Sequence, residues 1–205
     1  MARPVRLLAV LLACGTTLSV LPSPAVATLP GNGFEGVTVI GSGGGEQVWV
    51  AVQRQWKADP PGQVTLARFT PATGEWGFVA YPLDAAQPGA WVGLSEVTAL
   101  NGHTLLVLER DNQRGAAAKT KKVYRVDISG TTPVAAGEPK PLVAKTFAYD
   151  LLPALTAGGG AAHDKPEGLA VVGDGPVRRL VGVVDNDGVE DAPGESVFLR
   201  LGRIR

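Results

Sequence analysis

The chain has 205 residues, with 19 basic and 19 acidic side chains and therefore a formal net charge of zero. This balance gives no support for a protein that binds nucleic acid or a membrane surface, because both depend on an excess of positive charge. The length fits one ordinary domain or part of a larger one. The 27 glycines and 16 prolines favour many turns and few long helices, and short valine-rich runs favour β structure.

Residues 1–27 have the three parts of a secretory signal peptide. Arg3 and Arg6 supply the positive region, an apolar run follows, and small residues before position 28 suit cleavage after Ala27. The apolar run is too short, and its flanks are wrong, for a membrane-spanning helix. We therefore expect a bacterial protein that is secreted or periplasmic.

A second interpretation of the same region rests on Cys14. The sequence LLAC that ends there resembles a bacterial lipoprotein box, which would leave a lipidated Cys14 as the new N-terminus. Leu12 is less usual in such a box, so cleavage after Ala27 is the preferred interpretation. Cys14 is the only cysteine, so no disulfide is expected in the mature domain.

Short apolar runs separated by turn residues predict an all-β domain from about residue 28 to 205. Asn101 and Gly102 lie between two such runs, and this dipeptide is typical of a tight β-hairpin. One short helical turn is predicted within 150–158, where Pro153 limits its length. In chain order, the expected strands are 36–40, 48–53, 64–70, 76–83, 96–100, 104–111, 122–128, 142–149, 167–172, 178–185 and 196–201.

Three segments, beginning at Gly33, Leu94 and Lys165, share one plan. Each has a glutamate, an apolar strand, a tight turn, a second apolar strand and a polar end. With two further strands between repeats, four strands per repeat predict a β-propeller-like fold of about three four-stranded blades. A closed propeller usually has about four to eight blades, so we expect an incomplete propeller whose open edges favour self-association.

The hairpin in each repeat predicts that polar residues gather at one rim. The start of one strand and the end of its antiparallel neighbour lie at the same end of a sheet. Carboxylates held close together raise one another's pKa or require a cation. The groups expected at this rim are Glu35 with Gln53, Glu96 with Glu109 and Asp111, and Glu167 with Asp185 and Asp187.

This set of acids suits a hard cation such as Ca²⁺, which prefers oxygen ligands and would polarise a bound phosphate. Arg110 is the candidate contact for phosphate oxygens. A structural interpretation stays open, in which the acids cap turns and Arg110 forms a salt bridge at the rim. The candidates are Glu96, Glu109 and Glu167 as catalytic residues, and Glu35, Asp111, Asp185 and Asp187 as metal ligands.

Several spaced motifs, GFEGVTV, VLERDN, KKVYRVDISG, KPEGLAVV and VVDNDGVEDAPGESVFLRLG, resemble an exported bacterial family known as esterase-like activity of phytase, or phytase-like. The resemblance extends from about Asn32 to Arg205. It implies a β-propeller-like fold and hydrolysis of a phosphoester or carboxylester. Members of this family are usually longer, so the chain is expected to be a shortened member that covers the C-terminal portion.

Two functions of different classes follow. The first is a metal-assisted hydrolase acting on a small-molecule ester or phosphoester. The second is a non-catalytic extracellular or periplasmic binding module, or an inactive propeller fragment. A turnover assay distinguishes them, because only the first releases product.

Overall fold

The computed structural model describes residues 33–157, 165–185 and 197–204. Within them the chain is all-β, with three antiparallel sheets and very little helix, and this confirms the predicted fold class. The predicted cleavage site at Ala27, the alternative lipidation site Cys14 and the candidate ligand Asp187 lie outside the described residues. No helix in the described ranges is both long and apolar enough to span a membrane.

Each sheet contains consecutive strands in chain order, as in a propeller blade, and we call the sheets blades 1, 2 and 3. Blade 1 contains β1 (Phe34–Ile40), β2 (Gln47–Val52), β3 (Gln63–Thr70) and β4 (Glu75–Pro82). Blade 2 contains β5 (Val92–Asn101), β6 (Thr104–Asp111), β7 (Lys121–Asp127) and β8 (Lys145–Asp150). Blade 3 contains β9 (Pro166–Val172), β10 (Arg179–Val184) and β11 (Val197–Arg203). The short helical pieces are η1 (Gly115–Ala117), α2 (Leu152–Thr156) and η2 (Gly175–Val177).

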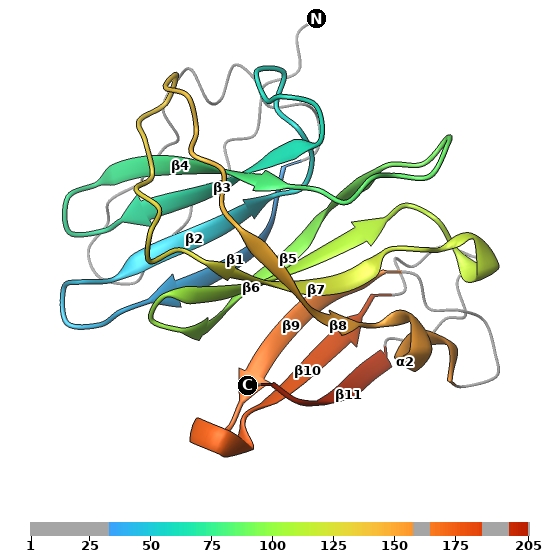
Figure 1. Ribbon diagram of the computed structural model, residues 1–205. Coiled ribbons are helices and arrows are strands. Elements are labelled where there is room, and N and C mark those ends of the chain that lie inside the picture. Colours follow the sequence, from blue (N-terminus) through green and yellow to red (C-terminus); the bar gives the residue numbers. More distant parts are fainter. Residues whose placement is uncertain (1–32, 158–164, 186–196, 205) are drawn as a thin grey trace, which may run out of the picture.

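The first strands of the three blades lie at the centre of the molecule. β5 packs against β1 on one side and against β9 on the other, so the three strands meet at the centre (Figure 1). Thr38 on β1 ties the first two blades together, because its hydroxyl accepts a hydrogen bond of 3.0 Å from the backbone N–H of Ala99. The rim where β1, β5 and β9 begin is therefore built from all three blades.

Two hydrophobic cores fill the spaces between the blades. Side chains alternate along a strand, so neighbouring residues of β6 serve different cores. Leu105 and Val107 pack toward blade 1, whereas Leu106 and Leu108 pack toward blade 3. Blade 2 thus has a core on each face, and β6 contains the apolar run LLVL for that reason.

A segment between β7 and β8 leaves blade 2 and pairs with the outer edge of blade 1. Phe78 and Val134 exchange backbone hydrogen bonds of 2.8 and 3.0 Å, and the backbone of Ala80 bonds to Pro141 and Val143. We call residues 133–143 the crossover segment. It covers the outer edge of β4, and an uncovered edge is prone to aggregation.

One predicted strand is wrong because part of it belongs to the crossover segment. The sequence predicts a single strand over 142–149, whereas Val143 bonds to blade 1 and β8 begins only at Lys145. A predicted strand at 96–100 is also too short, since β5 begins at Val92. The predicted helical turn is confirmed as α2, and blade 3 has three described strands.

Candidate active site

Charged residues meet at the rim where β1, β5 and β9 begin. Glu35 and Glu167 are each the second residue of their strands, and Arg110 lies near the end of β6. The carboxylate of Glu35 accepts a hydrogen bond from the side-chain amide of Gln53, as the hairpin predicts. Arg110 forms an ion pair with Glu167, with 3.2 Å between Nη2 and Oε1. The rim thus joins side chains from all three blades.

The carboxylates at the rim influence one another's protonation. Burial and the negative charge of Glu167 raise the pKa of Glu35 above its ordinary value. The positive charges of Arg110 and Lys165 act in the opposite direction. Because like charges close together favour protonation of one partner, the rim holds a proton more readily than separate glutamates would.

Glu96 lies between the central strands, beside Gly36 of β1 and Leu169 of β9. A β-bulge between Leu94 and Glu96 interrupts the pairing of β5 with β6 and turns the Glu96 side chain out of the regular alternation. Its carboxylate accepts a hydrogen bond of 2.7 Å from the N–H of Val97 and another from the N–H of Leu169 on β9. Glu96 therefore lies at the junction of the central strands.

Burial raises the pKa of Glu96 to about 7. The hydrogen bonds from Val97 and Leu169 favour the anion, but they do not outweigh the loss of hydration, and the negative charge of Glu35 adds to the increase. A carboxyl group with a pKa near neutrality takes up and releases a proton at physiological pH. Such a group close to other charged side chains is typical of acid–base chemistry.

Gly36 makes room for this arrangement. A Cβ atom at this position would contact the backbone N of Val97 and the carboxylate of Glu96, and would lie 2.7 Å from the Glu96 Cα. Two of these contacts are with backbone atoms, so β1 and β5 would have to separate. The close approach of the two strands requires a glycine here.

We expect Gly36→Ala to destabilise the fold by about 2–3 kcal/mol, because overpacking displaces the central strands. Urea unfolding of the variant measures this loss. Gly43→Ala is the matched control: no atom lies within 4 Å of the added Cβ, and its positive φ angle alone causes strain. A Gly36→Ala variant no less stable than the Gly43→Ala variant would contradict the close approach.

Arg110 is held rigidly between the rim and the interior. Only 7% of its side chain is exposed, and its Nε donates a hydrogen bond of 2.6 Å to the hydroxyl of Ser95. Its guanidinium also lies over the ring of Trp91, 5.8 Å from the centroid, and Arg54 lies over the same ring at 4.7 Å. Both predicted roles of Arg110 fit this position, since it forms a salt bridge and lines a pocket.

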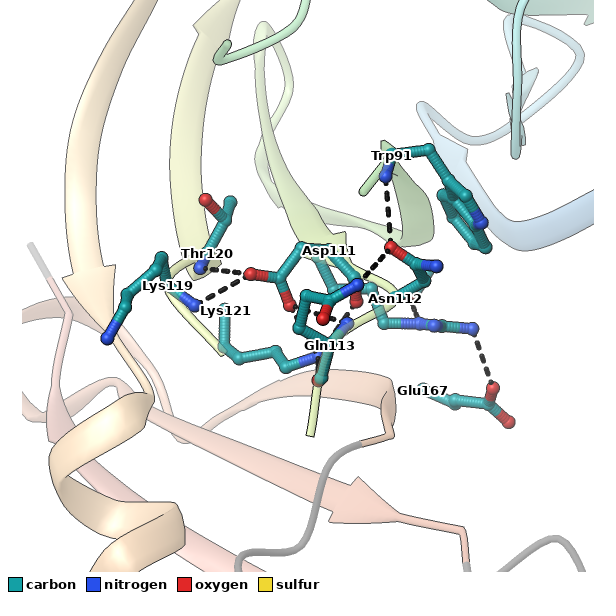
Figure 2. Close-up of polar contacts among 10 residues, drawn as sticks. Trp91, Asp111, Asn112, Gln113, Lys119, Thr120, Lys121 and Glu167 are labelled. Atoms are coloured by element: carbon teal, nitrogen blue, oxygen red, sulfur yellow. Dashed lines mark hydrogen bonds and ion pairs between the residues drawn. The ribbon is translucent and has the colours of Figure 1, made fainter. Parts of the chain in front are cut away.

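Asp111 organises the loop that follows β6 (Figure 2). Its Oδ2 accepts hydrogen bonds from the backbone N–H groups of Lys119 at 2.7 Å and Thr120 at 2.9 Å. Its Oδ1 lies 3.0 Å from Nζ of Lys121, and both side chains are almost completely buried. Although burial opposes ionisation, these contacts lower the pKa of Asp111. The predicted metal ligand thus lies in a closed set of protein contacts.

Glu109 points to the face of blade 2 that is opposite the face carrying Glu96 and Arg110. It is paired with Leu94 on β5 and is completely buried against blade 1. The structure therefore separates Glu109 from Glu96, although hairpin geometry predicts that the two lie together at the rim. Its carboxylate accepts a hydrogen bond of 2.7 Å from the hydroxyl of Tyr81 and forms an ion pair with Lys145.

A pocket of about 220 Å³, which we call the cationic pocket, opens beside Arg110. Its charged lining residues contribute four positive charges and one negative charge, the latter from Asp111. Arg114, Lys121 and Lys165 supply the other positive charges. Arg110 and Lys121 have carboxylate partners in Glu167 and Asp111.

The structure does not assemble the predicted calcium ligands into one cluster. Among the described residues, no group of three or more histidine, cysteine, aspartate or glutamate side chains is placed to hold a metal ion. Asp185 is exposed, and its backbone N–H bonds to Lys165 O at the start of the β9–β10 hairpin. Asp187 lies outside the described residues, so calcium binding stays a prediction.

Sequence reasoning missed Trp91, Lys121 and Lys165 as residues of this rim. Lys121 is buried at the start of β7. Its position immediately before an apolar strand is the signal that separates it from its exposed neighbour Lys119.

The family model described as "Phytase-like: Esterase-like activity of phytase" matches residues 7–188 of the chain. The match covers most of the sequence, including β1 to β10. No curated protein and no solved structure matches the chain significantly.

Proposed function

Because the chain belongs to the phytase-like family, which is described by esterase-like activity, we propose that it is a hydrolase of ester bonds. Its active site in this proposal is the rim where β1, β5 and β9 begin. The observation that carries this proposal is Glu96, whose pKa is raised to about 7 at the junction of the three blades. Glu35 lies close enough to Glu96 to raise this pKa further, and Glu35 is in turn influenced by Glu167 and Arg110. Ionisable groups with perturbed pKa values that meet in this way are typical of active sites.

In the proposed reaction, the ionised form of Glu96 accepts a proton from a water molecule. The water oxygen forms a bond to the carbon or phosphorus atom of the ester as the bond to the alcohol oxygen breaks. The proton then passes from Glu96 to the departing alcohol. A carboxylate with a pKa near 7 is a stronger base than an ordinary glutamate, and this favours the first step.

Arg110 has a second role in this proposal. Its guanidinium stabilises the negative charge that develops on the ester oxygens in the transition state. The hydrogen bond to Ser95 and the ion pair with Glu167 fix its orientation before the substrate binds. Preorganised charge of this kind is effective because it requires no rearrangement during the reaction.

Release of 4-nitrophenol from 4-nitrophenyl phosphate and from 4-nitrophenyl acetate tests this proposal. Hydrolysis of either compound by the wild-type chain, and its loss in Glu96→Gln, would support a hydrolase of the corresponding ester class. A folded chain that releases no product from either compound favours the non-catalytic binding module.

We also propose that calcium binds at the rim, where a cation between Glu35 and Glu167 would relieve their repulsion. The described residues alone do not form a complete ligand set, so no step above involves the ion. Titration calorimetry measures the Kd of calcium binding. At a calcium concentration of 100 times this Kd, we expect the fold to be stabilised by about 2.7 kcal/mol.

Glu167→Gln should weaken this binding, whereas the control Asp127→Asn should not, because Asp127 ends β7 at the opposite end of blade 2. A titration with neither heat nor a thermal shift would remove calcium from the proposal.

A further inference from the structure

A pocket lies at the outer edge of blade 1, between the crossover segment and the loop that joins β2 to β3. We call it the crossover pocket. Its volume is about 470 Å³, which is in the usual range for a site that binds a small organic molecule. It shares no lining residue with the cationic pocket beside Arg110. The crossover pocket is therefore separate from the rim to which hydrolysis is assigned.

Both walls of the crossover pocket are held by backbone contacts. On one side, the lining residues 135–140 lie between the backbone pairs that join the crossover segment to Phe78 and Ala80 of β4 (Figure 1). On the other side, the N–H of Asp59 donates a hydrogen bond of 3.0 Å to the carbonyl of Trp56. The two walls are therefore in place before any ligand binds.

Most of the lining of this pocket is apolar. The aromatic side chains of Trp56 and Phe78 contact one another edge to face, with 5.7 Å between their ring centroids. Alanine, glycine and proline residues supply most of the remaining lining. Such a surface favours a ligand with an apolar body, because burying that body removes apolar area from water.

One fixed ion pair also lines the crossover pocket. Lys140 is paired with Asp59, and only 2% of the Asp59 side chain is exposed. The second carboxylate oxygen of Asp59 accepts a hydrogen bond of 2.9 Å from the backbone N–H of Trp56. The ammonium group of Lys140 donates a hydrogen bond of 2.6 Å to the hydroxyl of Thr65 and lies over the Trp56 ring. These contacts set the position of the Lys140 ammonium group.

Lys140 keeps one donor for a ligand. An ammonium group has three N–H donors, and Asp59 and Thr65 accept two of them. Within the described part of the chain, Lys140 makes no other hydrogen bond, and 17% of its side chain is exposed. The charged lining residues Asp59, Glu138 and Lys140 carry two negative charges and one positive charge. A neutral hydrogen-bond acceptor suits this balance better than an anion does.

We propose that the crossover pocket binds a neutral organic molecule with an apolar body and a carbonyl oxygen, and that this oxygen accepts a hydrogen bond from Lys140. The inference does not rest on the proposed hydrolase function. It assigns a ligand class to blade 1 whether or not the rim catalyses hydrolysis.

Backbone amide chemical shifts of the nitrogen-15-labelled chain measure this binding and locate it. The probes are acetophenone, α-methylstyrene, in which a CH₂ group replaces the carbonyl oxygen, and benzoate, which carries a negative charge. We expect acetophenone to shift the amide signals of Trp56, Phe78 and Lys140. It should bind at least about tenfold more tightly than benzoate, because an apolar pocket does not repay the lost hydration of a carboxylate.

Variants of the pocket separate the donor from the apolar lining. The double variant Lys140→Met with Asp59→Asn removes the donor without leaving a buried charge unpaired. It should weaken acetophenone binding by about tenfold, the loss expected for a hydrogen bond from a charged group, and change α-methylstyrene binding by less than about twofold.

A second variant tests the location of the site. Ala58→Phe places a large side chain in the lining and should abolish binding of both neutral probes. Ala116→Phe is the matched control, because Ala116 is an exposed residue of η1 outside this pocket. Thermal unfolding confirms that each variant is folded.

Equal losses for acetophenone and α-methylstyrene in the double variant would overturn the role of Lys140. Benzoate that binds as tightly as acetophenone would overturn the preference for a neutral ligand, and acetophenone binding that survives Ala58→Phe would refute the site. Glu96→Gln should leave acetophenone binding unchanged while it abolishes hydrolysis, so the two proposals fail independently.

Discussion

Glu96→Gln is expected to lower kcat for ester hydrolysis by at least about 100-fold, the usual contribution of a positioned acid–base group. Glutamine has nearly the same shape and can keep an oxygen near the N–H groups of Val97 and Leu169, but it cannot accept a proton from water. The initial rate of 4-nitrophenol release measures the loss. Glu75→Gln is the matched control, since Glu75 is exposed at the start of β4, away from the rim.

The same group predicts the pH dependence. Since the base must be ionised, the wild-type rate should rise with pH up to about 7 and then level off. Stability should change in the opposite direction. The pKa of Glu96 is higher in the folded chain than the ordinary value of 4.5, so its contribution to stability is present below pH 4.5 and is lost as pH rises through 7.

Glu96→Gln should therefore stabilise the fold at pH 8 by about 1–3 kcal/mol while it removes activity. A variant that retains half of the wild-type rate would refute the assigned role. An unchanged thermal midpoint at pH 8 would instead contradict the raised pKa.

Lys145→Met is expected to be the most destabilising substitution of a charged residue between blades 1 and 2. Lys145 forms ion pairs with Glu109 and Asp84, and its ammonium group lies over the rings of Tyr81 and Tyr124. Burial already raises the pKa of Glu109, and Lys145 counteracts that effect. Without the lysine, a completely buried carboxylate loses its positive partner, which costs about 3–5 kcal/mol at neutral pH.

Urea unfolding at several pH values tests this expectation. Loss of Lys145 should raise the pKa of Glu109 further, so the variant should be much less stable than the wild type at pH 8 and closer to it at pH 5. The double variant Lys145→Met with Glu109→Gln should recover much of the loss. Lys122→Met is the control: its pair with Asp84 is partly exposed, with 29% and 25% of the side chains accessible, and contributes about 1 kcal/mol or less.

Those parts of the fold that depend on local patterns can be predicted from the sequence. Short apolar runs between turn residues locate eleven strands, and the threefold recurrence of a glutamate before a hairpin predicts the blades. Hairpin geometry brings Gln53 to Glu35, and the same logic places Glu167 at the rim. These predictions succeed because antiparallel pairing within one hairpin is set by neighbouring residues.

The remaining features depend on contacts between distant segments. The bulge at Ser95 changes the face of blade 2 on which the Glu96 side chain lies, and no turn residue marks it. Alternation sends Glu109 and Arg110 to opposite faces of blade 2, so adjacent charges in the sequence have separate environments. The raised pKa of Glu96 follows from burial by β1 and β9, which no local pattern determines.

The crossover segment has a consequence for how the chain folds and opens. It leaves blade 2 after β7, pairs with β4 and then returns to form β8, so the outer strand of blade 2 is tethered to the outer edge of blade 1 (Figure 1). Blades 1 and 2 therefore cannot separate without breaking backbone pairs at Phe78 and Ala80. We expect their amide protons to exchange with solvent as one cooperative unit. Blade 3 has no such tether among the described residues and should open at a lower free energy. The rim where β1, β5 and β9 begin therefore lies at the boundary between a more stable unit, blades 1 and 2, and a less stable one, blade 3.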